Sequence, residues 1–166
     1  MDYIIREFQS CSEMLSFYSS KRESCFLELE SQSPKKFYGI DLLESEQSIY
    51  FCSDGLCELQ ISEAHGLIAF LVDDYFVFIN PAKNFKKTIR LNAPGDSLFH
   101  RNERFVAIYE TGVFIFSPDK EIGECKETDD LIYDWNFLSD SVIHCKLCDG
   151  SEYNIDLRTI FCDSKT

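Results

Sequence analysis

The segment His144-Cys145-Lys146-Leu147-Cys148 has the spacing closest to that of a metal site. Two cysteines separated by two residues form half of many zinc sites. The segment also alternates like a β-strand, however, in which residues three apart point to opposite faces. The other close pair, Cys52 and Cys57, has four residues between its members. We therefore expect ordinary thiols here, with no bound metal and no cofactor.

Two pairs of adjacent carboxylates, Asp73-Asp74 and Asp129-Asp130, are the next candidates for chemistry. Paired carboxylates carry out acid and base catalysis in glycosidases. Adjacent acids at turns, however, are usually solvated. The sequence contains no nucleophile elbow, phosphate-binding loop, dinucleotide fingerprint, H-E-x-x-H motif or calcium-loop spacing. We therefore expect a protein that is not an enzyme.

The charge balance favours a basic protein as the partner. Asp and Glu number 29 against 16 Lys and Arg, a formal net charge of −13. Such a surface repels phosphate backbones and anionic membranes, and it attracts basic proteins. The charge is uneven, because thirteen acids face five bases from Glu110 to the end. Solubility is the other reading of this acidity.

The eight cysteines raise the question of compartment. A disulfide framework requires an oxidising compartment. The first residues, MDYIIREFQSCSEML, carry acids and have no continuous apolar core, so they do not resemble a signal peptide or a membrane span. We expect a cytoplasmic protein with reduced, mostly buried thiols.

The first 22 residues have the spacing of an amphipathic helix. Their apolar side chains recur every three or four residues, which gathers them into one helical stripe. We expect a helix in residues 1–22 that packs on a sheet. The stripe consists of Ile4, Ile5, Phe8, Cys11, Leu15 and Tyr18.

From residue 23 to 166 the apolar period changes to two, which predicts strands. The first are expected at 25–29 and 37–42. The next two, at 49–52 and 56–61, flank Ser53-Asp54-Gly55, and Asp-Gly is a strong hairpin signal. We therefore expect those two strands to pair.

The rest of the chain repeats one unit: strand, acidic or glycine turn, strand. The units cover 67–79, 105–116 and 142–157, and their turns recur about every 37 or 38 residues. A period near 40 with several short strands indicates propeller blades, and propellers close with at least four. We predict one mainly β domain over 1–166, with open antiparallel sheets in a partial, half-propeller-like arc. A twisted open sheet or a sandwich is the alternative.

Equivalent turns of a repeat emerge on one face, so the three turns should form one negative rim. Aromatic residues beside the acids are the kind of anchor that interfaces use. Trp135 fits the core equally well. The expected partner-binding residues are Asp73, Asp74, Glu110, Asp129, Asp130, Tyr133, Asp134, Trp135 and Asp149.

The chain as a whole resembles the immunity proteins of bacterial contact-dependent growth inhibition systems. The resemblance lies in length, acidity, abundant Phe, Tyr and Cys, a blade-like repeat and no catalytic motif. It implies a 1:1 complex with a cognate toxin, of the nuclease and more narrowly the ribonuclease class, whose basic active site the protein covers. The alternative is a scaffold or adaptor module whose incomplete propeller another subunit completes.

Overall fold

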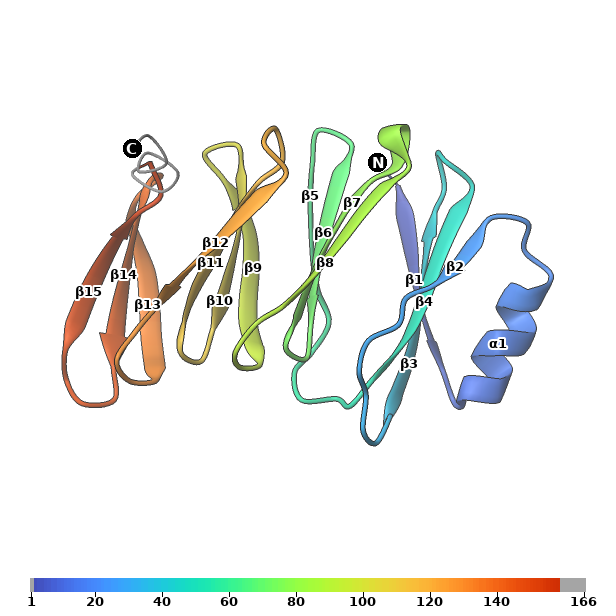
Figure 1. The fold of residues 1–166 in the computed structure, drawn as a ribbon, viewed down its shortest axis with the longest axis horizontal. Helices are drawn as coiled ribbons and strands as arrows, with labels where there is room; N and C mark the ends of the chain where they lie inside the picture. The colour runs from blue at the N-terminus through green and yellow to red at the C-terminus, as the bar shows by residue number, and fades with distance from the viewer. Residues whose placement is uncertain (1, 159–166) are drawn as a thin grey trace.

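Four mainly antiparallel sheets stack side by side into an open arc, with one helix outside the first sheet (Figure 1). This computed structural model describes residues 2–158, and within them the predicted mainly β, open, propeller-like architecture is confirmed. We label the sheets A to D along the chain. The helical elements of the described chain are α1 (Cys11–Ser19) and the short 3-10 helix η1 (Pro81–Lys83).

Each sheet takes its strands from one stretch of sequence. Sheet A has the order β1-β3-β4-β2, and its short β2 runs parallel to β4. Sheets B and C are four-stranded meanders, and sheet D has three described strands. The strands of A and B are β1 (Tyr3–Phe8), β2 (Ser24–Phe26), β3 (Lys36–Leu42), β4 (Gln47–Ser53), β5 (Gln60–Ala64), β6 (Leu67–Val72), β7 (Tyr75–Asn80) and β8 (Phe85–Arg90). Those of C and D are β9 (Gly95–Arg101), β10 (Arg104–Tyr109), β11 (Gly112–Ser117), β12 (Ile122–Glu127), β13 (Ile132–Ser139), β14 (Val142–Leu147) and β15 (Glu152–Asp156).

The core consists of three apolar layers, one between each pair of neighbouring sheets. Phe51 of sheet A stacks on Phe70 of sheet B with ring centroids 5.2 Å apart. Phe76 of sheet B packs on Phe114 of sheet C at 4.8 Å. Ile143 and other residues of sheet D close the third layer against sheet C. The central strands β6, β7, β10 and β11 are therefore buried on both faces, which explains their continuous apolar runs.

The helix prediction for residues 1–22 is wrong in its first part. Residues 3–8 form β1, which pairs antiparallel with β3 from Tyr3 opposite Leu42 to Phe8 opposite Phe37. Ile4 and Ile5 are 40% and 47% exposed, so they belong to no buried helical stripe. The helix begins after Ser10, whose hydroxyl accepts from the Glu13 N–H and so caps the helix. The Glu13 carboxylate in turn accepts from the N–H of Gln9, one residue before the cap.

The hairpin predicted at Ser53-Asp54-Gly55 is also wrong. β4 belongs to sheet A and β5 to sheet B, so residues 54–59 connect two sheets. Asp54 has a different task, because its carboxylate accepts hydrogen bonds from the Ser31 hydroxyl and from the Gln32 and Ser33 N–H groups. It thereby ties the segment before β3 to the end of β4.

Helix α1 covers the outer face of sheet A through Tyr18. The Tyr18 ring stacks on Tyr50 at 4.8 Å, and its hydroxyl donates to the buried Asp41 carboxylate. The same carboxylate accepts from Arg6, Lys21 and Ser48 at 2.7–2.8 Å. Desolvation opposes its ionised form, but these donors outweigh that and lower the pKa of Asp41 to about 2.

Gly39 makes room for this contact. A Cβ at position 39 would lie 1.9 Å from the Tyr18 hydroxyl oxygen. We predict that Gly39→Ala lowers the unfolding free energy in urea by about 2 kcal/mol, because the side chains must repack. In a Tyr18→Ala background the same change should cost less than half as much. Equal costs in both backgrounds would contradict the predicted clash.

Asp41 should make stability depend on acid pH. Its folded pKa lies below that of an unfolded aspartate, so it stabilises the fold above about pH 4 and this contribution fades as the pH falls towards 2. We predict that parent and Asp41→Asn differ by about 2 kcal/mol at pH 6, and that most of this difference is lost only when the pH reaches about 2. The measurement is urea unfolding across this range; a constant difference would contradict the prediction.

Candidate functional site

The acidic turns lie at one end of the arc, as the repeat predicts (Figure 1, lower edge). The turns at 73–74, 110–111 and 148–151 emerge there, together with the connections 54–59 and 128–131. We call these five connections the acidic rim. Its acids are Asp54, Glu58, Asp73, Asp74, Glu110, Asp129, Asp130 and Asp149, and its five connections contain no lysine or arginine.

Asp73 is the exception among the predicted rim residues, because it is buried. Its side chain accepts from the Ser53 hydroxyl at 3.1 Å and from the Asp54 and Leu56 N–H groups at 2.8 Å each. Only 5% of the residue is exposed. Asp73 thus holds the connection from sheet A to sheet B in place and presents no charge to a partner.

The other predicted carboxylates stay partly or fully exposed, and all of them except Glu110 have partners among residues 2–158. Asp74 pairs with Arg90 at 2.7 Å, and Asp130 accepts from the Leu131 N–H. Asp129 accepts from the Tyr153 hydroxyl at 2.6 Å, which raises the pKa of that tyrosine. Hydrogen bonds from Ser151 lower the pKa of Asp149.

Four predicted residues meet in one cavity between sheets C and D. This cavity of about 370 Å³ is lined by Glu110, Tyr133, Asp134 and Trp135, with Asp96, Ile108, Tyr109 and Ile132. Asp96 was not among the predicted residues, because it lies in the basic stretch 83–104 and no local pattern marks it. Asp73, Asp74 and Asp149 do not line the cavity.

The indole of Trp135 is fixed as a wall of this cavity. Its Nε1–H donates to an Asp96 carboxylate oxygen at 3.1 Å, and its ring packs edge-on against Phe99 at 4.8 Å and Phe137 at 6.1 Å. The residue is half-buried, so it is neither a protruding anchor nor a full core residue. Tyr133 is 62% exposed and remains available as an anchor.

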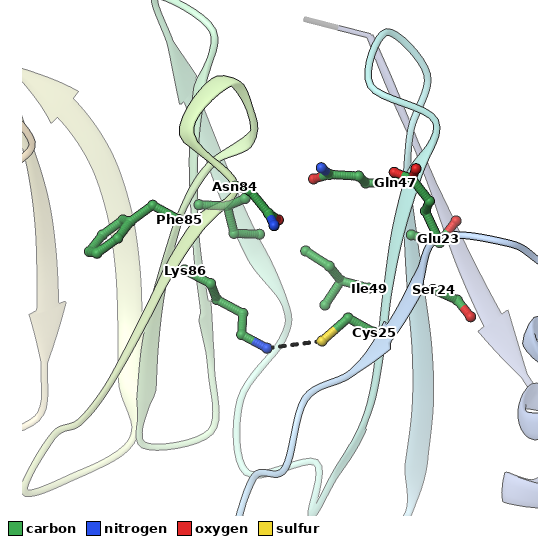
Figure 2. A pocket seen from close by; sticks show the side chains of 10 residues that line it. Glu23, Ser24, Cys25, Gln47, Ile49, Asn84, Phe85 and Lys86 are labelled. Atoms are coloured by element: carbon green, nitrogen blue, oxygen red, sulfur yellow. Dashed lines mark hydrogen bonds between the residues drawn. The ribbon is translucent and has the colours of Figure 1, made fainter.

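A larger cavity of about 490 Å³ lies between sheets A and B (Figure 2). Lys86 reaches across from β8 and its ammonium donates to the Cys25 thiol at 3.0 Å. The walls include Ile49 and Phe85, and the Ser24 hydroxyl donates to backbone carbonyls of Tyr18 and Lys21. Cys25 and Lys86 are thus the nucleophilic side chain and the amine that this cavity brings together.

A third cavity, of about 750 Å³, lies beside α1 and contains Arg6 and Lys21. Both cations already pair with Asp41, at 2.8 and 2.7 Å. This arrangement serves the docking of the helix. The cavity between sheets C and D is therefore the best candidate for recognition.

The cysteines are less buried than expected. Of those in residues 2–158, Cys145 is buried while Cys25, Cys125 and Cys148 are exposed, and all are free thiols. Burial raises the pKa of Cys145 to about 11. Residues 2–158 contain no group of three His, Cys, Asp or Glu side chains placed to hold a metal ion. They also contain no helix with the length and apolarity to cross a membrane.

Comparisons with known proteins give only distant structural likeness. No family model and no curated protein matches the chain. The extracellular domain of BT4673 from B. thetaiotaomicron, described as a one-component system, matches with a TM-score of 0.47 at 15% identity over 79% of this chain and 22% of that one. Hsv2 from Kluyveromyces marxianus gives 0.35 at 18%, over 72% and 42%. This chain therefore spans less than half the length of either, and neither likeness carries an argument about function.

Because Asp73 is buried and the other rim acids are not, its replacement should affect stability more than theirs. We predict that Asp73→Lys lowers the unfolding free energy by about 3 kcal/mol or more, because three donors lose their acceptor and a cation is buried. Asp149→Lys, a matched reversal at an exposed turn, should change it by less than about 0.5 kcal/mol. Urea unfolding of both variants is the measurement, and equal effects would contradict the structural role of Asp73.

Proposed function

We propose that this protein is an immunity protein, a cytoplasmic inhibitor that binds one basic toxin domain and covers its active site. The observation that carries the proposal is the gathering of acids on the acidic rim. The connections at the opposite end of the arc are mixed in charge, because Lys83 and Lys120 lie among acids such as Glu103. One end of the molecule therefore presents a negative surface.

A nuclease is the class of toxin that this surface suits best. The active site of a nuclease holds a polyanion and is therefore basic, so a row of carboxylates can occupy it in place of phosphates. Long-range attraction would steer the encounter, and close packing would then exclude the substrate. A standard interface of about 1,600 Å² is sufficient for tight binding of this kind.

The charges of the acidic rim lie apart from the apolar core of the protein. Its exposed acids lie in connections between strands, while the apolar layers lie between the sheets. The five connections contain no lysine or arginine. From outside them, Arg90 at the end of β8 pairs with Asp74. Lys35 attracts the Asp54 carboxylate, and Lys36 attracts that of Glu58. The remaining carboxylates supply the net negative potential of this end.

The alternative, a scaffold whose propeller another subunit completes, agrees less well with the outer faces of the two end sheets than the inhibitor role does. Continuation of a propeller requires an apolar face at each end of the arc. Helix α1 already covers the face of sheet A. The outer face of sheet D is polar: Lys146 pairs with Asp134 at 2.9 Å, and the His144 imidazole bonds to Asn154. A scaffold would require these polar groups to be buried.

The proposal predicts a partner with defined properties and a salt-sensitive association rate. The protein, purified from its native cell with its bound partner, should bring down one basic protein in 1:1 ratio that is toxic when expressed alone. The association rate, measured by stopped flow, should fall about tenfold or more between 20 and 300 mM salt, while the dissociation rate changes less.

Charge reversal provides the matched control. The triple variant Asp74→Lys, Asp130→Lys and Asp149→Lys should slow association further and protect cells less. Its counterpart at the opposite end, Glu46→Lys, Glu103→Lys and Asp140→Lys, has the same net charge and should associate faster than the rim variant. If both triple variants associate equally, the rim is not the docking surface. A stable assembly with non-toxic subunits would support the scaffold instead.

A further inference from the structure

The cavity between sheets C and D presents carboxylates and an aromatic ring to one small space. Asp96 and Glu110 line it from sheet C, and Trp135 lines it from sheet D. No lysine or arginine is among the residues that line it. Its volume of about 370 Å³ is at the lower end of the range for ligand pockets, which suits one long side chain better than a large molecule.

The carboxylates of Asp96 and Glu110 differ in their hydrogen bonds. Asp96 accepts from the Trp135 indole at 3.1 Å and from the Ser97 hydroxyl at 2.8 Å, so its orientation is set before a partner arrives. Glu110 is exposed, and its carboxylate makes no hydrogen bond or ion pair with residues 2–158. Asp134 also lines the cavity, but its carboxylate pairs with Lys146 on the outer face of sheet D, which lowers the pKa of Asp134. Asp96 and Glu110 therefore remain to receive a cation.

The side chains that line the cavity favour a guanidinium over an ammonium. A guanidinium is planar, donates through a fixed fork to carboxylates and stacks on aromatic faces. The Trp135 ring is held in place by Phe99 and Phe137. Apolar walls from Ile108 and Ile132 can pack against the aliphatic part of an arginine side chain.

We propose that this cavity receives an arginine side chain of the partner protein, with the guanidinium between Asp96 and Glu110 and against Trp135. The inference rests on the proposed function in one respect, that the partner is a basic protein. It adds the position and the chemistry of one contact. The cavity opens at the end of the arc that carries the acidic rim, since β9 and β13 begin there and β10 ends there.

Trp135 is the single tryptophan of the chain, so its fluorescence reports on this cavity. The test titrates the protein at low salt with acetyl-Gly-Arg-Gly-amide. The neutral isostere acetyl-Gly-citrulline-Gly-amide is the matched control ligand. We expect the arginine peptide to change the Trp135 fluorescence in a saturable way. The citrulline peptide should bind at least about tenfold more weakly, because it lacks one charged contact.

Two variants assign the effect to the cavity. Glu110→Gln and Asp96→Asn each remove a charge, and an asparagine oxygen can still accept from the indole. Each substitution should weaken binding of the arginine peptide about fivefold or more. The control Asp140→Asn removes the same charge from an exposed turn at the opposite end and should leave binding within about twofold. Equal binding of both peptides, no saturation by 50 mM, or equal loss in Asp140→Asn would overturn the assignment.

The same variants separate this inference from the proposed function. If the native toxin binds Glu110→Gln and Asp96→Asn as tightly as the parent, the cavity is not a contact and the inhibitor role stands. If no basic partner exists in the cell, the inhibitor role fails, and with it the assignment of the arginine to a partner, whatever the peptides do. Support requires that both the peptide and the toxin bind these variants at least about fivefold more weakly.

Discussion

The structure depends on apolar packing between the faces of neighbouring sheets. Phe51 on Phe70, and Phe76 on Phe114, belong to successive layers of this packing. Each inner sheet is covered by a neighbour on both faces, so its stability is a property of the stack. Within residues 2–158, the two end sheets have no neighbouring sheet on their outer faces. Sheet A is covered there by α1, whereas sheet D carries polar, partly exposed side chains such as His144 and Lys146. An open arc can therefore be stable without closing into a ring.

Burial in the layers leaves the ends of the sheets free for recognition. At the acidic rim, exposed residues such as Glu110 and Asp149 contribute little to the core, so their charge can serve binding. Asp73 and Asp41 also carry negative charge, yet both are buried. Donors from other segments hydrogen-bond to both carboxylates, and two cations also pair with that of Asp41. The protein thus uses carboxylates in two ways, and burial rather than position in the sequence decides which.

Much of the architecture was predictable because the repeat is local. The pairs of strands that flank the turns at 73–74, 110–111 and 148–151 follow from local sequence. Both the alternation of apolar and polar residues and the turn residues lie within about ten positions of each other. The errors occur where distant segments decide. Tyr3 pairs with Leu42, a partner that the first residues do not specify, so their spacing alone wrongly predicts a helix where β1 lies. Asp-Gly at 54–55 predicts a turn correctly but does not tell which strands pair, and here they belong to different sheets.

The candidate site shows the same division between local and distant information. Glu110, Tyr133, Asp134 and Trp135 were predicted as parts of a rim, and the stacking of sheet D on sheet C brings them to one cavity. Asp96 joins them only through the fold, because β9 begins beside the Trp135 indole. This contact also changes the expected role of Trp135, whose ring is held on one side by Phe99 and whose N–H is already used. A tryptophan constrained in this way can form the wall of a pocket that receives a partner's side chain. An anchor residue, in contrast, must protrude from the surface so that its side chain can enter a pocket of the partner.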